Sequence, residues 1–404
     1  MIRRIRNLGA SGVLVALTQV FLIVVIAQFR GLKEIGEYSY ILALCVPLNV
    51  LGLFGFKQVL ASQQDSAMAL AKALKIRFAF HSVIYFIFIL LVALISLEVS
   101  LSFVIALSLF KFIESHHELH IGAYQNNNLT SAIDKLNVFK CLVYILIALL
   151  VVLSNLDLAW VFTIGSGALL VHYYWVLRPQ SNLSSNTNTN LEGVQSSSIL
   201  RIASRLVFIA LFTALLANLP KYYLMAYSNI EQLAIFTLFF QALSFVNMLV
   251  INLINYQWGK IKQSVEAQAH QASAIIRHTH VKKLLLLTSI VSVAVVGFSF
   301  ISMHLVSFVF NVDTQPYFIE WLLVNVAFAF NFYSHLLNAL NILLKKEQAL
   351  AQATLLNFVV ALLFGYFLPL NQGVLGASVL LLVIFGLKGA FGTTILLKGA
   401  SREQ

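Results

Sequence analysis

Apolar stretches long enough to cross a bilayer recur along the chain, separated by short polar segments. A membrane-spanning helix takes about 20 predominantly apolar residues, and such stretches run from the first helix almost to the C-terminus. The pattern predicts an all-α polytopic membrane protein of about twelve transmembrane helices. We place these helices near 11–29, 38–60, 76–96, 100–124, 137–154, 157–177, 199–219, 233–257, 283–305, 317–344, 350–370 and 373–397.

One polar connection divides this series into two halves. Residues 181–198 are rich in Asn, Ser and Thr, which is typical of a flexible linker. We expect an N-terminal six-helix bundle of residues 1–180, a cytoplasmic linker of residues 181–198 and a C-terminal six-helix bundle of residues 199–404. A weak repeat, Ser115-His116 and Ser334-His335, supports paired halves, which in transporters place the substrate site between them.

Composition excludes an ordinary soluble domain. Of the 404 residues, 60% are hydrophobic and 10% are charged, against roughly 45–50% and about 25% in soluble proteins. The net charge of +11 does not indicate nucleic-acid binding, because the basic residues lie in short segments between helices. Cys45 and Cys141 both lie in apolar segments, so we expect no disulfide framework.

The basic residues predict the orientation of the chain. With a cytoplasmic N-terminus, only Arg30, Lys33 and Lys221 of the 26 Lys and Arg residues fall outside. Lys111 and Lys388 fall inside helices, and the remaining 21 lie on the cytoplasmic side, where loops collect positive charge. Both termini are therefore expected in the cytoplasm. The long first apolar run lacks a small-residue cleavage pattern, which favours an uncleaved helix over a signal peptide.

Ionisable side chains in the fourth predicted helix are the first candidates for a substrate site. Lys111, Glu114, Ser115 and Glu118 recur at helical spacing and share one face. Charge at the bilayer centre costs roughly 2.5–3.5 kcal/mol or more, so this face avoids lipid. Two interpretations stay open. In the first, the face lines a cavity, where Lys111 contacts an anionic head group and a carboxylate binds a proton or cation. In the second, a Lys–Glu ion pair stabilises the bundle.

Histidines in the same helix raise the question of a metal. His116 and His120 lie one turn apart, as metal ligands do. The protease spacing His-Glu-x-x-His is absent, because the histidine after His117-Glu118 comes one residue too early. We therefore predict no metal site and no cofactor.

Other basic and amide side chains complete the candidate site. Four further basic residues are candidates: Lys57, Arg30 and Lys221 at helix ends, and Lys388 inside the last helix. Each of these side chains either contacts a phosphate or extends to the membrane interface, and both interpretations stay open. Two predicted helices carry amides that suit sugar hydroxyls, with interhelical hydrogen bonds as the alternative. These polar groups are Asn331, Ser334, His335, Asn338 and Asn341, and Gln241, Ser244, Asn247, Asn252 and Asn255.

Short motifs follow one another in order along nearly the whole chain. Residues 31–39 (GLKEIGEYS) precede an apolar helix that ends at Gly55-Phe56-Lys57. Residues 111–115 (KFIES) and the glycine-rich stretch 371–377 (NQGVLGA) lie further on, with Leu219-Pro220-Lys221 between them. In this order the motifs resemble those of the O-antigen and polysaccharide flippases of the MOP (multidrug/oligosaccharidyl-lipid/polysaccharide) exporter superfamily.

The resemblance implies a fold, a cargo and partners. The fold is that of multidrug exporters and the lipid II flippase, with a cationic cavity that opens alternately to each side. The cargo is an undecaprenyl-pyrophosphate-linked oligosaccharide, an O-antigen or similar surface unit, moved from the cytoplasmic to the periplasmic leaflet of the bacterial inner membrane. A coupling ion, proton or sodium, and polysaccharide assembly proteins are further candidate partners, besides the membrane lipid itself.

Pyrophosphate enters hydrocarbon only where cationic or hydrogen-bonding groups replace its water. The first helix lacks the Arg-rich pattern of lipid II flippases, since only Gln19 and Gln28 interrupt its apolar run before Arg30. Lys57, Lys111 and Lys388 are therefore the expected pyrophosphate ligands.

Two other functions are compatible with a polytopic chain. A cation-coupled multidrug exporter of the same fold needs carboxylates to bind its cationic cargo. Carboxylates are scarce in the predicted inner bundle outside Glu114 and Glu118, which favours an anionic cargo. A membrane polysaccharide polymerase or acyltransferase needs a nucleophile and a base, and no such constellation or nucleotide-binding motif is visible. The sequence thus favours a transporter over an enzyme and leaves the glycan open.

Overall fold

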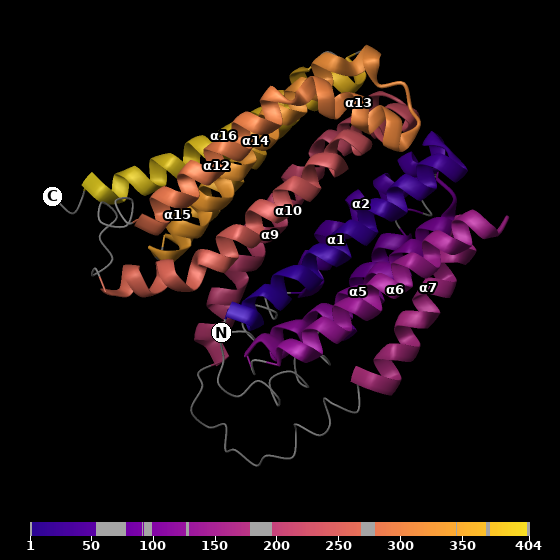
Figure 1. Ribbon diagram of the computed structural model, residues 1–404, viewed down its shortest axis with the longest axis horizontal. Coiled ribbons are helices and arrows are strands. Elements are labelled where there is room, and N and C mark those ends of the chain that lie inside the picture. The colour runs from indigo at the N-terminus through magenta and orange to yellow at the C-terminus, as the bar shows by residue number, and fades with distance from the viewer. Residues whose placement is uncertain are drawn as a thin grey trace. The chain divides into compact units, whose positions relative to one another are not determined.

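The computed structural model is helical throughout most of the residues that it describes, which are 2–53, 78–90, 92, 99–126, 129–177, 196–267, 279–344, 346–368 and 372–401. The chain divides into two compact units, Met1–Ala214 and Leu215–Gln404. Within each unit the long apolar helices lie side by side (Figure 1). This agrees with the predicted all-α polytopic membrane fold.

Unit 1 is built from the N-terminal helices. They are α1 (Ile2–Arg30), α2 (Leu32–Leu53), a helix at Phe78–Leu90, α5 (Leu101–Asn126), α6 (Thr130–Leu153), α7 (Leu158–His172) with a π-helical turn at Tyr173–Leu177, and the first part of α9 (Ser196–Tyr227). Helix α1 packs against α6, and α5 packs against α7. Gly31, at φ +100°, separates α1 from α2, and its N–H bonds the Ile26 carbonyl at 3.2 Å. This backbone conformation favours glycine.

Aromatic side chains fill the space between α5, α6 and α7. The ring centroid of Phe110 lies 5.5 Å from that of Phe162 and 5.6 Å from that of Tyr144. Gly165 permits this close packing, because a Cβ there would lie 2.6 Å from Cδ1 of Ile147. Helices α5, α6 and α7 are therefore held tightly together.

Unit 2 is centred on α14. Its helices are the end of α9, α10 (Ile230–Ala267), α12 (Thr279–Gly297), α13 (Ser299–Phe310), a short 3-10 turn (Gln315–Tyr317), α14 (Phe318–Leu343), α15 (Glu347–Phe367) and α16 (Gly373–Ser401). Helix α14 packs against α16, α12 and α10 (Figure 1). Buried amides join these helices, since Asn341 donates to the Gly392 carbonyl at 2.9 Å and Asn357 to the Ile384 carbonyl at 3.0 Å. For Asn341 this is the interhelical hydrogen bond weighed as an alternative to sugar binding.

The observed helices lie where membrane spans are expected. Within the described ranges, nine helices are long and apolar enough to cross a membrane, and α12 with α13 make ten if the bent pair is one span. Helix α5, with its charged residues, lies at the predicted span 100–124, and the shorter apolar helix Phe78–Leu90 lies within the predicted span 76–96.

One predicted span is broken. The prediction of a single helix at 283–305 is wrong, because α12 ends at Gly297 and α13 begins at Ser299 with a bend of 68° between them. Glycine is a poor helix former, and nearby side chains satisfy the main chain around the break. The Ser299 hydroxyl donates to the Val296 carbonyl at 2.7 Å, and the Trp321 indole donates to the Ser299 carbonyl at 2.8 Å.

The predicted division of the chain falls at residues 181–198, of which the structure describes only the start of α9 at Ser196. The two compact units instead meet along the chain between Ala214 and Leu215, within α9. The bundles of residues 1–180 and 199–404 therefore stay a prediction.

Gly373→Ala is expected to lower the melting temperature of the purified protein. Gly373 has φ +48°, and a Cβ there would lie 2.0 Å from Oε1 of Gln232. A left-handed residue other than glycine costs about 1–2 kcal/mol, and Gln232 must move as well. Gly386→Ala in the same helix is the control, because a Cβ there meets nothing within 4 Å. Equal melting temperatures for both variants would contradict the expectation.

Candidate functional site

Helix α5 turns its predicted polar face toward the inside of unit 1. Lys111 Nζ lies 2.7 Å from Glu114 Oε2, and the two side chains are only 13% and 12% exposed. The i,i+3 spacing places both groups on one turn of the helix. Residues Gln19, Lys111, Glu114 and Tyr144, which are joined by hydrogen bonds, are called the Lys111 cluster below.

The hydroxyl of Tyr144 connects three helices in this cluster. It donates to Glu114 Oε1 at 2.6 Å and accepts hydrogen bonds from Lys111 Nζ and Gln19 Nε2, each at 3.0 Å. Gln19 comes from α1, the ion pair from α5 and Tyr144 from α6. One phenol therefore uses its proton and both lone pairs to hold a charge pair away from lipid. Tyr144 is not among the site residues predicted from the sequence, although it is a polar group in an apolar helix, one turn after Lys140.

A second ion pair lies one turn further along α5. Lys140 Nζ lies 2.5 Å from Glu118 Oε1, and the Lys140 side chain is 2% exposed. Lys140 is one of the 21 basic residues expected on the cytoplasmic side, because its helix is predicted to begin near 137, whereas α6 begins at Thr130. The earlier start places Lys140 about 15 Å along the helix, at 1.5 Å per residue. Both carboxylates of the α5 face, Glu114 and Glu118, are thus neutralised by lysines.

The histidines of α5 pack against aromatic rings and main chain. His117 bonds the Ile113 carbonyl through Nδ1 at 3.0 Å, and its Nε2 lies 3.4 Å from Nδ1 of His172. The ring centroid of His116 lies 4.8 Å from that of Phe112. In the part of the chain that the structure describes, no three His, Cys, Asp or Glu side chains come together as metal ligands.

A different polar arrangement lies in unit 2. Lys388 Nζ of α16 donates to Asn331 Oδ1 of α14 at 3.1 Å. Asn331 in turn donates to Asn247 Oδ1 of α10 at 3.3 Å and accepts a hydrogen bond from the Ser334 hydroxyl at 3.2 Å. We call Asn247, Asn331, Ser334 and Lys388 the Lys388 cluster. This cluster brings together predicted site residues from three helices. Lys388 is its one charged member, and the other three members are uncharged.

Two predicted residues of α14 add unused hydrogen-bonding capacity nearby. His335 and Asn338 follow Asn331 at helical spacing. Among the described residues, buried His335 Nε2 and Asn338 Oδ1 have no hydrogen-bond partner. Such buried atoms are uncommon in proteins, and bound ligands are one way of satisfying them.

Lys221 is a buried cation of unit 2. It lies inside α9, is 3% exposed and has its Nζ 5.1 Å from the centroid of the Phe240 ring, a cation–π contact. The structure describes no carboxylate in salt-bridge distance of Lys221 or of Lys388. Among the described residues, Lys111 and Lys140 of unit 1 are therefore balanced by carboxylates, whereas Lys221 and Lys388 of unit 2 are not.

Two predicted site residues lie apart from these clusters. Arg30 donates through Nη2 to the carbonyls of Val151 at 3.2 Å and Ser154 at 2.6 Å, at the end of α6. Cations favour this end of a helix, so the contact matches the anchoring interpretation of Arg30. Lys57 lies outside the described residues.

Known proteins resemble this chain in structure. No family model and no curated protein matches the sequence. The inward-facing conformation of a multidrug resistance MATE family transporter of the MOP superfamily matches with a TM-score of 0.67 and 12% identity, over 96% of this chain and 94% of that one. The bent form of the MATE transporter VcmN from Vibrio cholerae matches with a TM-score of 0.62 and 12% identity, over 99% and 97%.

A third similar structure is a MOP superfamily transporter from Pyrococcus furiosus, whose binding pocket is described as having reverse polarity that suggests a different function. It matches with a TM-score of 0.64 and 13% identity, over 99% of this chain and 95% of that one. At such identities the likeness establishes the fold, and this chain has the fold of the MOP superfamily transporters.

Tyr144→Phe is expected to destabilise unit 1 by about 1–3 kcal/mol, the cost of buried polar groups that lose their partner. Glu114 and Gln19 each lose a hydrogen bond to the hydroxyl. Cys45 and Cys141 are buried, so a thiol-reactive dye reports thermal unfolding directly. Tyr366→Phe is the matched control, because Tyr366 is 73% exposed. An unchanged melting temperature for Tyr144→Phe would show that the hydroxyl does not hold the cluster together.

Proposed function

We propose that the chain is a membrane transporter that moves a diphosphate-linked, lipid-anchored oligosaccharide between bilayer leaflets by alternating access. The observation that supports this proposal most strongly is that neither Lys221, which is buried, nor Lys388, which is partly buried, has a carboxylate partner among the described residues. An ammonium group taken out of water costs several kcal/mol unless an anion compensates it. A transported anion supplies that compensation during each cycle.

The groups around Lys388 suit a glycan attached to such an anion. Asn331 and Ser334 present donors and acceptors beside the ammonium, and His335 and Asn338 hold buried polar atoms without a described partner. Amides and imidazoles bind sugar hydroxyls through paired donors and acceptors. Lys388, Lys221, Asn331, His335 and Asn338 are therefore the residues that we assign to head-group and sugar contacts.

Unit 1 offers a means of coupling transport to an ion. Lys111 and Glu114 neutralise each other in the described state. When Lys111 turns to a diphosphate, Glu114 loses its cation and gains affinity for a proton or sodium ion, since an isolated buried carboxylate is costly. The cavity-wall and ion-pair interpretations of α5 then describe two states of one site.

The biological setting of the proposal rests on the sequence motifs. Their likeness to O-antigen and polysaccharide flippases favours an undecaprenyl-pyrophosphate carrier lipid, movement from the cytoplasmic to the periplasmic leaflet of a bacterial inner membrane, and contacts with polysaccharide assembly proteins. This role requires no covalent chemistry from the chain.

A cation-coupled multidrug exporter is the second candidate, because two of the similar structures are MATE transporters, one of them described as a multidrug resistance protein. A cationic drug needs a carboxylate that is free to pair with it. Glu114 and Glu118 are paired with Lys111 and Lys140, and the cations of the candidate site in unit 2 are Lys221, which is buried, and Lys388, which is partly buried. The charge distribution therefore favours an anionic cargo.

Binding of soluble head-group analogues tests the proposal. We expect purified protein in nanodiscs to bind a short-chain isoprenyl diphosphate sugar at least about tenfold more tightly than the same sugar on an uncharged isoprenol. Tighter binding of a cationic dye, with no preference for the diphosphate, would favour the multidrug exporter instead.

A further inference from the structure

A row of aromatic rings joins two lysines of unit 2. Lys221 Nζ lies 5.1 Å from the centroid of the Phe240 ring. The Phe240 centroid lies 5.3 Å from that of Phe328, which in turn lies 5.6 Å from that of Phe385. Lys388 Nζ lies 5.9 Å from the Phe385 centroid. We call Phe240, Phe328 and Phe385 the phenylalanine row, and one ammonium group lies at each end of it.

The two lysines lie at different depths of unit 2. Helices α10 and α16 begin side by side, because a Cβ at Gly373 would clash with Gln232, and residues 228–229 alone separate the end of α9 from the start of α10. At about 1.5 Å per residue, Lys221 is about 9 Å from this end of unit 2 along α9, and Lys388 is about 22 Å from it along α16. The phenylalanine row therefore leads from one depth in the membrane to another.

Lys221 points into unit 2 and not to the membrane interface. Its side chain is buried, and the ring that its Nζ contacts belongs to Phe240, about 15 Å from the start of α10. Extension to the interface, one of the two interpretations of Lys221 from the sequence, would instead place the ammonium group in water. The position of the side chain favours the other interpretation, contact with an anion.

A ring face holds an ammonium group more loosely than a carboxylate does. The negative face of the ring attracts the cation, but the ring carries no net charge and leaves the N–H groups on its far side unused. A diphosphate offers oxygen atoms that accept charge-assisted hydrogen bonds, which are stronger. The rings therefore keep Lys221 and Lys388 in place without neutralising them, and either ammonium group can turn toward an anion.

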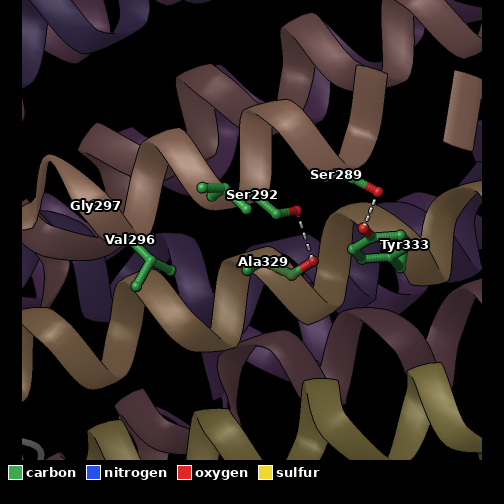
Figure 2. Close-up of a pocket in the computed structure, with 7 residues that line it drawn as sticks. Ser289, Ser292, Val296, Gly297, Ala329 and Tyr333 are labelled. Atoms are coloured by element: carbon green, nitrogen blue, oxygen red, sulfur yellow. Dashed lines mark hydrogen bonds between the residues drawn. The ribbon is translucent and has the colours of Figure 1, made fainter. Parts of the chain in front are cut away.

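Helix α14 holds the middle ring of the row in place. Phe328 is 1% exposed. Elsewhere on α14 the Tyr333 hydroxyl and the Ser289 hydroxyl of α12 bond each other. The Ser292 hydroxyl of α12 also donates to the Ala329 carbonyl at 3.4 Å, and Figure 2 shows both bonds across the pocket between the two helices. Two bonds to the same neighbour limit rotation of α14 about its axis, so the middle ring stays between the outer two.

We propose that Lys388 and Lys221 are two successive sites for the transported diphosphate and that the phenylalanine row positions them. The inference rests on the proposed function and adds the order of the contacts. Lys388 forms the tighter site, because the Asn331 amide beside it adds a donor and an acceptor. Lys221 forms the transit site, which receives the anion on its way between Lys388 and the end of unit 2 where α9 ends. The rings are positioning residues that act through the lysines.

Separate measurements of binding and flipping test the two sites. Each variant is titrated in nanodiscs with a short-chain isoprenyl diphosphate sugar, and its flipping of a fluorescent polyprenyl-diphosphate oligosaccharide is followed in proteoliposomes. We expect Lys221→Met to bind within about threefold of the wild type and to flip at least about tenfold more slowly, because it keeps the tighter site and loses the transit site. Lys388→Met is expected to lower binding and flipping together.

Ring variants separate positioning from packing. Phe240→Leu should slow flipping about as much as Lys221→Met does, and Phe240→Tyr should restore it, because the ring face returns. A trifluorinated phenylalanine in place of Phe240 keeps the shape of the ring and weakens its negative face, so flipping should fall by about threefold or more. Phe239→Leu is the matched control, because its ring is also on α10 but packs on Trp321, with centroids 5.1 Å apart.

Three results would overturn the inference. Flipping by Lys221→Met at the wild-type rate would remove Lys221 from the path. An equal loss of binding in Lys221→Met and Lys388→Met would show one site instead of two. Unchanged flipping with the trifluorinated ring would show that the row only packs. Failure of the proposed function looks different, because the wild type would then neither prefer the diphosphate sugar in the titration nor flip the lipid.

Discussion

Lys388→Met is expected to weaken binding of a diphosphate-linked sugar by about 10- to 100-fold. A hydrogen bond to a charged group contributes about 1.5–3 kcal/mol, and each 1.4 kcal/mol is about tenfold in affinity. Met keeps most of the length of the side chain and removes its charge. The variant protein should fold, because Lys388 is only partly buried and its removal leaves no carboxylate unpaired among the described residues.

Two further variants make this result specific. Lys388→Arg keeps the charge and should retain part of the binding, whereas Lys283→Met removes an exposed lysine of α12 and should change nothing. Binding is measured by titration in nanodiscs, and stability by thermal unfolding of the same samples. Unchanged binding together with a lower melting temperature for Lys388→Met would show that Lys388 supports packing and does not hold cargo.

Glu114→Leu is expected to destabilise the protein by about 3–5 kcal/mol, the cost of leaving one partner of a buried ion pair alone. In this variant Lys111 keeps only the Tyr144 hydroxyl among its present hydrogen-bond partners. The double variant Lys111→Met, Glu114→Leu should regain most of the loss, because both charges are gone. The difference between the single and double variants measures the interaction directly.

The double variant also separates the two interpretations of the α5 face. If the pair only stabilises unit 1, the double variant folds and still transports. If Lys111 contacts the head group and Glu114 binds the coupling ion, the double variant folds and transport is lost. Glu231→Leu, at an exposed carboxylate, is the control. Single variants as stable as the wild type would contradict the ion pair itself.

The helices could be predicted from the sequence because length and apolarity decide them locally. Each predicted span coincides at least in part with a helix that the structure describes. The shared face of Lys111 and Glu114 could be predicted for the same reason, since an i,i+3 spacing fixes it within one helix. Helix starts were less certain, as Lys140 shows: the earlier start of α6 turns a cytoplasmic lysine into a buried one.

The partners across helices could not be predicted. Tyr144 is separated from Glu114 by 30 residues and Lys388 from Asn331 by 57. Such pairs depend on how helices pack, which a single sequence does not specify. The break at Gly297 was missed because a lone glycine in an apolar run is tolerated in many helices. Its effect here depends on Ser299 and on Trp321 from another helix.

The most direct test of the proposed transport is flipping in vesicles. Purified protein is reconstituted in proteoliposomes with a fluorescent polyprenyl-diphosphate oligosaccharide, and a quencher outside reports the accessible leaflet. The protein is expected to accelerate exchange between leaflets, Lys388→Met to remove the acceleration and Lys283→Met to retain it. No acceleration by the wild type, in vesicles where the same protein moves a cationic dye, would show that the chain does not move the diphosphate-linked lipid.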